Sequence, residues 1–203
     1  MPVLDGQAKR VQAQLDTALR VVGNLRTIEG LSRQYVAELI VVRVFALFEA
    51  IVEESACRLV CGASYCDGSM PALLRSHPTR SIALALEAMK RHGRLQPITE
   101  LRWSKASEIS KNLESLFPPN EHFVGILRGH GQFISDLRKV RNHIAHGNRG
   151  TSIRFQEVIS NYYGSKIPGL PPGKMLLSSR FQPLLVEKFC RQAGVILRAA
   201  LRA

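Results

Sequence analysis

Acidic residues are scarce in this chain, and their scarcity is the first guide to its partners. The 203 residues include 28 Lys and Arg against 16 Asp and Glu, which gives a net charge of +12. An excess of this size favours polyanionic partners, with nucleic acid ahead of an anionic membrane surface. The plainer interpretation is that the charge only keeps the protein in solution, because charge alone carries no sequence specificity.

Long apolar runs are also missing. Charged side chains interrupt the first twenty residues five times, so we expect no secretory signal. The most apolar stretch, 36–52, contains Glu38, Arg43 and Glu49, and it fits a buried helix better than a membrane span. We therefore expect a cytoplasmic protein that does not associate with membranes.

Cysteines are few, and their spacing argues against a metal site. Cys57, Cys61 and Cys66 have C-x3-C-x4-C spacing, which matches no common zinc pattern, and Cys190 lies far along the chain. His77 is the one candidate for a fourth ligand. We interpret the cysteines as free, reduced thiols of a cytoplasmic protein, and we expect neither a metal nor a cofactor.

Alternation of apolar and polar residues is too short to predict a sheet, so the chain is predicted to be all-α. Apolar residues recur at three- and four-residue steps, and Gly and Pro separate the periodic segments. The segment 148–178 is predicted to be mostly irregular, with a short helix at 153–163. We predict one domain over 1–203, with helices at about 5–27, 33–61, 79–92, 104–115, 120–128, 131–146 and 180–202.

The most informative stretch is 137–147, which reads Leu-Arg-Lys-Val-Arg-Asn-His-Ile-Ala-His-Gly. Within six residues it contains a permanent cation, Arg141, a carboxamide, Asn142, and two imidazoles, His143 and His146. Arginine binds phosphate through two parallel hydrogen bonds, and histidine exchanges protons near neutral pH. The two residue types together are suited to attack on a phosphodiester without a metal.

Helical spacing alone does not bring the two key groups of this stretch together. Residues five apart are separated by about 140° around a helix, so Arg141 and His146 do not share a face. The length of the arginine side chain, or a break of helical geometry beside Gly147, would relax this constraint. A second copy of the chain would also relax it, because two short motifs that face each other form one cleft.

This stretch also carries a family resemblance. The segment Arg141-Asn-His-Ile-Ala-His146-Gly resembles the R-x4-6-H motif of HEPN domain proteins, commonly written R-N-x-x-A-H. The long, apolar second helix, which carries an acidic residue in the segment Val-Phe-Ala-Leu-Phe-Glu49-Ala, also resembles that superfamily. The likeness is closest to small prokaryotic HEPN proteins associated with RNA cleavage and defence.

The resemblance implies a fold, an activity and a set of site residues. It implies a HEPN-like helical bundle with a long central second helix and a C-terminal helix, and a homodimer that cuts RNA without metal. Arg141 would then bind the scissile phosphate, and His146 would transfer the proton of the ribose 2′-hydroxyl or of the leaving oxygen. The expected product is a 2′,3′-cyclic phosphate. Asn142 would orient the motif, and Glu49 would hold Arg141 in place.

The remaining predictions concern RNA contacts and partners. Basic and polar residues around the motif are expected to bind RNA, namely Arg138, Lys139, His143 and Arg149. The protein is expected to act as a toxin or defence effector, with an antitoxin as a further partner.

Three other functions stay open at this stage. A non-catalytic HEPN module would bind nucleic acid or nucleotides without cleavage, and a DNA-binding protein would place the 131–146 helix in a groove. A scaffolding protein would use its apolar second helix as an interface. Arg141 itself would be only a structural anchor if it pairs with Glu49 or Asp136.

Overall fold

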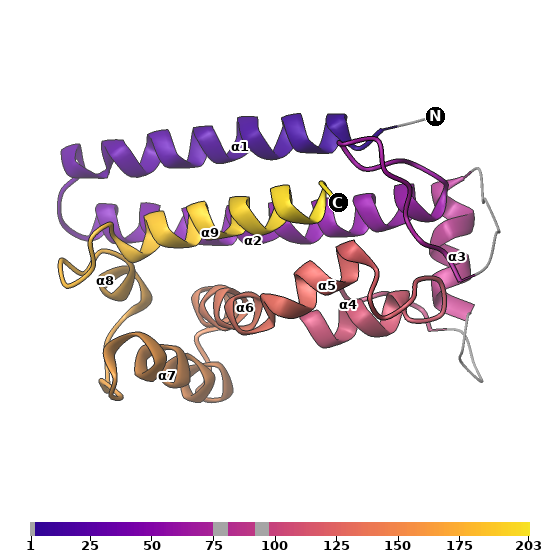
Figure 1. Cartoon of the computed structure of the whole chain (residues 1–203). Coiled ribbons are helices and arrows are strands. Elements are labelled where there is room, and N and C mark those ends of the chain that lie inside the picture. Colours follow the sequence, from indigo (N-terminus) through magenta and orange to yellow (C-terminus); the bar gives the residue numbers. More distant parts are fainter. Residues whose placement is uncertain (1–2, 75–80, 92–97) are drawn as a thin grey trace. The chain divides into compact units, whose positions relative to one another are not determined.

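The computed structural model describes residues 3–74, 81–91 and 98–203. Within these ranges the protein is all-α, as predicted, and its only β pairing is an isolated bridge between Val3 and Ser64. The helices are α1 (Asp5–Asn24), α2 (Gly30–Val60), α3 (Ile82–Arg91), α4 (Ala106–Leu113), α5 (His122–Gly129), α6 (Gly131–His146), α7 (Arg149–Tyr163), α8 (Pro172–Leu176) and α9 (Leu185–Ala200), with a short 3-10 helix at Leu25–Thr27 (Figure 1).

Most helix bounds follow the periodicity of the sequence. The helix α6 has the predicted bounds, and its buried stripe of Ile134, Leu137 and Val140 explains why. The predicted helix ends at 79 and 92 lie outside the described residues, although α3 itself occupies Ile82–Arg91.

One prediction is wrong. The segment 148–178 is mostly helical rather than irregular, because α7 occupies Arg149–Tyr163 and α8 occupies Pro172–Leu176. The short helix predicted at 153–163 is confirmed as the greater part of α7. The side chain of Asn148 caps α7 by accepting a hydrogen bond from the Thr151 amide at 2.9 Å, and Gly164 ends the helix at a φ of 79°. Both end signals are present in the sequence.

The described chain forms two compact units, each assembled from separate stretches of sequence. Helices α1, α2, α6 and α9 contribute residues to both units. Unit 1 consists of Met1–Gln12, Phe48–Ile134 and Val195–Ala203, and unit 2 consists of Ala13–Leu47 and Ser135–Gly194.

Unit 1 is stabilised by a buried polar cluster at the start of α5. Glu121 caps this helix, because its carboxylate accepts a hydrogen bond from the Phe123 amide at 2.7 Å and another from the Tyr65 hydroxyl. The ring of His122 meets the edge of Tyr65, and one ring nitrogen lies 2.8 Å from the carbonyl oxygen of Ala199. These contacts connect the loop after α2 to α5 and to the end of α9.

Unit 2 contains two antiparallel helix pairs. The second half of α1 and the first half of α2 form one pair, joined by the turn at Leu25–Thr27 (Figure 1). Helices α6 and α7 form the other pair, in which Asn161 donates to the carboxylate of Asp136 and Lys139 pairs with Glu157. Early residues of α6 therefore meet late residues of α7, as an antiparallel register requires.

The short helix α8 packs directly on α2. The amide of Gly173 donates to the Glu38 carboxylate at 2.8 Å. The approach is so close that a Cβ added at Gly173 would lie 2.5 Å from the Cβ of Gln34. A glycine is therefore required where α8 crosses α2.

Candidate functional site

The candidate site lies where α6 ends and α7 begins. Helix α6 stays regular through His146, and Gly147 then adopts the left-handed conformation with a φ of 56°. The Gly147 amide donates to the carbonyl of His143 at 2.9 Å, which closes the last turn. The residues 145–150 are exposed, so this helix junction is open to a ligand.

Arg141 is half-buried and oriented by two neighbours. Its guanidinium lies over the ring of Phe45, 5.7 Å from the ring centroid, and Nη1 donates to the Asn142 carboxamide oxygen at 3.0 Å. Within unit 2, no ion pair of the described residues involves Arg141. A guanidinium carries five N–H donors in a planar fork, so donors remain for an anion after the bond to Asn142.

His146 is exposed in the last turn of the same helix. The predicted break of helical geometry comes one residue later, at Gly147, so His146 keeps its helical position. It is therefore separated from Arg141 by about 140° around the helix axis. The structure places both groups at the open end of α6, on different sides of the helix.

His143 is held between the two helices. Its ring stacks on Phe155 with a centroid distance of 4.7 Å and an interplanar angle of 20°, and Nδ1 lies 3.3 Å from the Thr151 hydroxyl. That hydroxyl donates to the carbonyl of Asn148, so its oxygen is available to accept from Nδ1–H. Burial lowers the pKa of His143 below its ordinary value, which favours the neutral ring. The observed contacts give this histidine a packing role.

The other predicted RNA-binding residues differ in their surroundings. Lys139 forms an ion pair with Glu157 at 2.8 Å, and this pairing lowers the pKa of the Glu157 carboxyl. Arg149 is exposed as the first residue of α7, and Arg138 is half-buried on α6. Of these cations, Arg149 is the exposed one, and it follows His146 by three residues in the chain.

The fourth predicted catalytic residue, Glu49, lies elsewhere in the chain. It is half-buried on α2, in the part of that helix that belongs to unit 1, whereas Arg141 belongs to unit 2. The contact predicted between Glu49 and Arg141 stays a prediction.

Sequence reasoning missed the residues that hold the motif in place. Phe45 under Arg141, and Phe155 and Thr151 around His143, come from α2 and α7 rather than from the motif helix. The Asn148 cap was a signal in the sequence that could have placed the start of α7 at Arg149.

Two further predictions concern thiols and membranes. All four cysteines are free thiols, and burial raises the pKa of Cys57 and of Cys190 to about 12. His77 lies outside the described residues, and the described part of the chain holds no cluster of three or more His, Cys, Asp or Glu suited to a metal ion. None of the helices described here combines the length and the apolar character needed to cross a bilayer.

Comparison with known proteins returns no match at any of three levels. No protein-family model, no curated protein and no solved structure matches the chain. The resemblance to HEPN domain proteins therefore depends on the residues quoted above and stays a prediction.

Proposed function

We propose that this protein is a HEPN-type endoribonuclease that cuts RNA without a metal ion and acts as a toxin or defence effector. The observation that carries the proposal is the open end of α6. There an exposed imidazole, His146, follows a guanidinium, Arg141, that is oriented by Phe45 and Asn142 and keeps donors for a phosphate. The net charge of +12 favours an RNA substrate.

The chemistry requires one proton acceptor, one proton donor and one cation. The ribose 2′-oxygen attacks the adjacent phosphorus, and the bond from phosphorus to the 5′-oxygen breaks. An imidazole of His146 takes the 2′-proton, and a protonated imidazole gives a proton to the leaving 5′-oxygen. Arg141 stabilises the extra negative charge on the phosphoryl oxygens. The products are a 2′,3′-cyclic phosphate and a 5′-hydroxyl.

The reaction needs two histidines in these two roles, and one copy of the motif offers one. His143 is engaged with Phe155 and Thr151, which leaves His146 as the exposed histidine of the motif. A homodimer with two α6 ends in one cleft supplies the second imidazole. It also removes the problem of the 140° separation, since Arg141 of one copy faces His146 of the other.

The N-terminus of α7 adds a positive electrostatic potential next to His146, which favours a bound phosphate. Amides of the first turn of a helix carry partial positive charge and attract anions. In this protein that turn begins at Arg149, three residues after His146. A phosphate bound beside His146 would therefore lie near both the helix terminus and the Arg149 side chain.

The direct test is incubation of purified protein with RNA in EDTA. Wild type should cut, and His146→Ala should not. His130→Ala is the matched control, because His130 caps α5 in unit 1 and is not part of the motif. Cleavage that needs added metal, or that survives His146→Ala unchanged, would contradict the proposal. Salt-sensitive RNA binding without product would indicate the non-catalytic module instead.

Cell growth provides the second test. Expression of wild type should slow growth, and expression of Arg141→Ala should not, if the cleavage acts as a toxin. An antitoxin would be a separate chain that restores growth when it is co-expressed. Light scattering on the purified protein tests the homodimer, and a strict monomer at the assay concentration would refute the two-motif cleft.

A further inference from the structure

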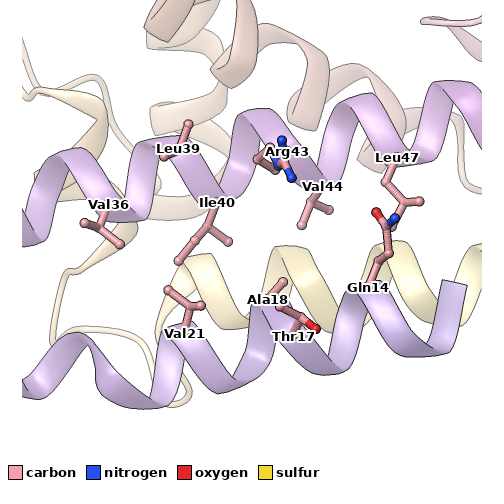
Figure 2. A pocket seen from close by; sticks show the side chains of 10 residues that line it. All are labelled: Gln14, Thr17, Ala18, Val21, Val36, Leu39, Ile40, Arg43, Val44 and Leu47. Atoms are coloured by element: carbon pink, nitrogen blue, oxygen red, sulfur yellow. The ribbon is translucent and has the colours of Figure 1, made fainter. Parts of the chain in front are cut away.

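An apolar groove of about 460 Å³ lies between the second half of α1 and the first half of α2, within unit 2. Val21 of α1 and Ile40 of α2 point toward each other across it (Figure 2). Ala18, Val36, Val44 and Leu47 continue the apolar lining, and Gln14 and Thr17 are the uncharged polar members. The groove is therefore a largely hydrophobic surface that the described chain leaves open.

Arg43 is the one charged residue among those that line the groove. It is exposed, and none of the described residues forms an ion pair or a hydrogen bond with it. A cation without a partner beside apolar walls is suited to a ligand that combines an apolar surface with a carboxylate.

The apolar surface continues along α2 from Leu39, which lines the groove, to Tyr35 and Leu31 beyond it. Leu31, Tyr35 and Leu39 recur at four-residue steps, which places them along one side of the helix, and they are 65%, 65% and 60% exposed. Arg43 is the next member of this series. The stripe from Leu31 to Arg43 is about 18 Å long, which corresponds to about three turns of a helix.

We propose that this groove and stripe bind an acidic amphipathic helix of a partner protein. The occupant is a helix because Tyr35 and Leu31 extend the apolar surface past the groove, where a small ligand would leave them uncovered. It is acidic because Arg43 forms no ion pair with any residue that the structure describes and because the whole chain carries +12. Apolar residues at three- and four-residue steps would meet the stripe, and an acidic residue of the partner would pair with Arg43.

A second copy of this chain fits the same surface less well. A twofold interface brings the same patch of each copy together, and the residues that line this groove include no acid. Such a contact would leave both Arg43 side chains without a carboxylate and would oppose two strongly basic chains. The inference does not depend on the proposed nuclease activity, whose motif lies on α6; α2 contributes Phe45 to that site, and Phe45 does not line the groove.

The test uses two synthetic peptides and the full-length protein. Each peptide is about 18 residues long and has leucine at every third or fourth position. In the first peptide the remaining positions are alanine and glutamate. In the second peptide they are alanine and lysine. Binding is measured by fluorescence anisotropy. The glutamate peptide should bind, the lysine peptide should not, and Leu39→Ser should weaken binding.

A matched pair of charge variants separates this site from general attraction to a basic protein. Arg43→Glu and Arg20→Glu change the net charge equally, and Arg20 is exposed on α1 outside the groove lining. Arg43→Glu should weaken binding of the glutamate peptide about tenfold, and Arg20→Glu should leave it nearly unchanged. Equal effects of the two variants would overturn the proposal.

Two further outcomes would assign the groove to another occupant and refute the helix. The first outcome uses decanoate, a small amphipathic anion. Decanoate would be indicated as the kind of ligand if it binds wild type, binds Arg43→Glu more weakly and displaces the peptide. A dimer that dissociates in Leu39→Ser, as shown by sedimentation, would indicate a second copy of this chain. Leu39 and Arg43 are exposed, so circular dichroism should show that these variants stay folded.

Discussion

Replacement of His146 with alanine tests the proposed chemistry at a position that contributes little to folding stability. The side chain is exposed in the last turn of α6, and the helix is closed by the Gly147 amide rather than by the imidazole. Surface substitutions of this kind change the unfolding free energy by less than about 0.5 kcal/mol. A loss of cleavage would therefore report on catalysis and not on stability.

The size of the expected loss follows from the role of the residue. A positioned acid or base accelerates a proton transfer by about 10²- to 10⁴-fold, which corresponds to roughly 3–5 kcal/mol in the barrier. In a dimer the substitution removes the acid and the base together, because both are copies of His146. We therefore expect the rate of His146→Ala to fall at the upper end of this range.

The assay is single-turnover cleavage of an end-labelled RNA in EDTA, with products separated on a denaturing gel. A second substrate, with deoxyribose at the cleaved position, should resist wild type because it lacks the 2′-oxygen that attacks phosphorus. A fall in rate of less than about tenfold would refute the assignment of His146. Cleavage of the deoxy substrate at the normal rate would refute the cyclic-phosphate route.

Four further variants test other parts of the structure. Arg141→Lys keeps the charge but loses the planar fork, so cleavage should fall by about tenfold or more while circular dichroism is unchanged. Burial lowers the pKa of His143 in the folded protein below its ordinary value of 6.5. The stability that depends on the neutral ring is therefore complete when the pH is above 6.5, and it is lost as the pH falls toward the lowered pKa. Thermal unfolding at about pH 7.5 and pH 5.5 should therefore show a smaller loss of Tm on acidification for His143→Phe than for wild type; equal losses would contradict the buried, neutral ring. Gly173→Ala would place a Cβ 2.5 Å from the Cβ of Gln34, and we expect urea unfolding to show a loss of about 1–3 kcal/mol. Gly147→Ala forces an L side chain into a φ of 56°, and the same measurement should show a loss of about 1–2 kcal/mol; an unchanged midpoint would mean that α6 ends differently.

Local signals were sufficient to predict the motif helix. Glycines flank α6 at both ends, and its buried residues Ile134, Leu137 and Val140 follow the period of a helix. The same reasoning placed α1 and most of α2, since each carries its own apolar pattern. Arg141, Asn142 and His146 were identified because their chemistry and spacing are local properties.

Local signals predicted the part of α7 over 153–163 but missed its first turn. Its first turns contain Gly150, Thr151 and Ile153, residue types that lower helix propensity. The helix forms because its partner supplies tertiary contacts, among them the ring of His143 on Phe155. Such contacts join residues that are separated in sequence, and a propensity pattern does not contain them.

The roles within the site also depended on tertiary structure. The sequence assigned His143 to RNA binding and His146 to proton transfer, but only the structure shows that His143 packs against α7 and that His146 is exposed. The environment of Arg141 likewise depends on Phe45, which α2 brings to it. A side chain's availability is decided by what folds against it, and only three-dimensional contacts provide that information.

The amino-acid sequence by itself determined the helical class, the basic charge and the position of one Arg-His motif, since each is a property of composition or of near neighbours. Tertiary structure alone decided which histidine of the motif faces solvent and where Arg43 meets an apolar groove. The burial and pairing of a side chain depend on segments that are distant in the chain. The free energy gained when these segments pack together exceeds the conformational preference of each segment alone.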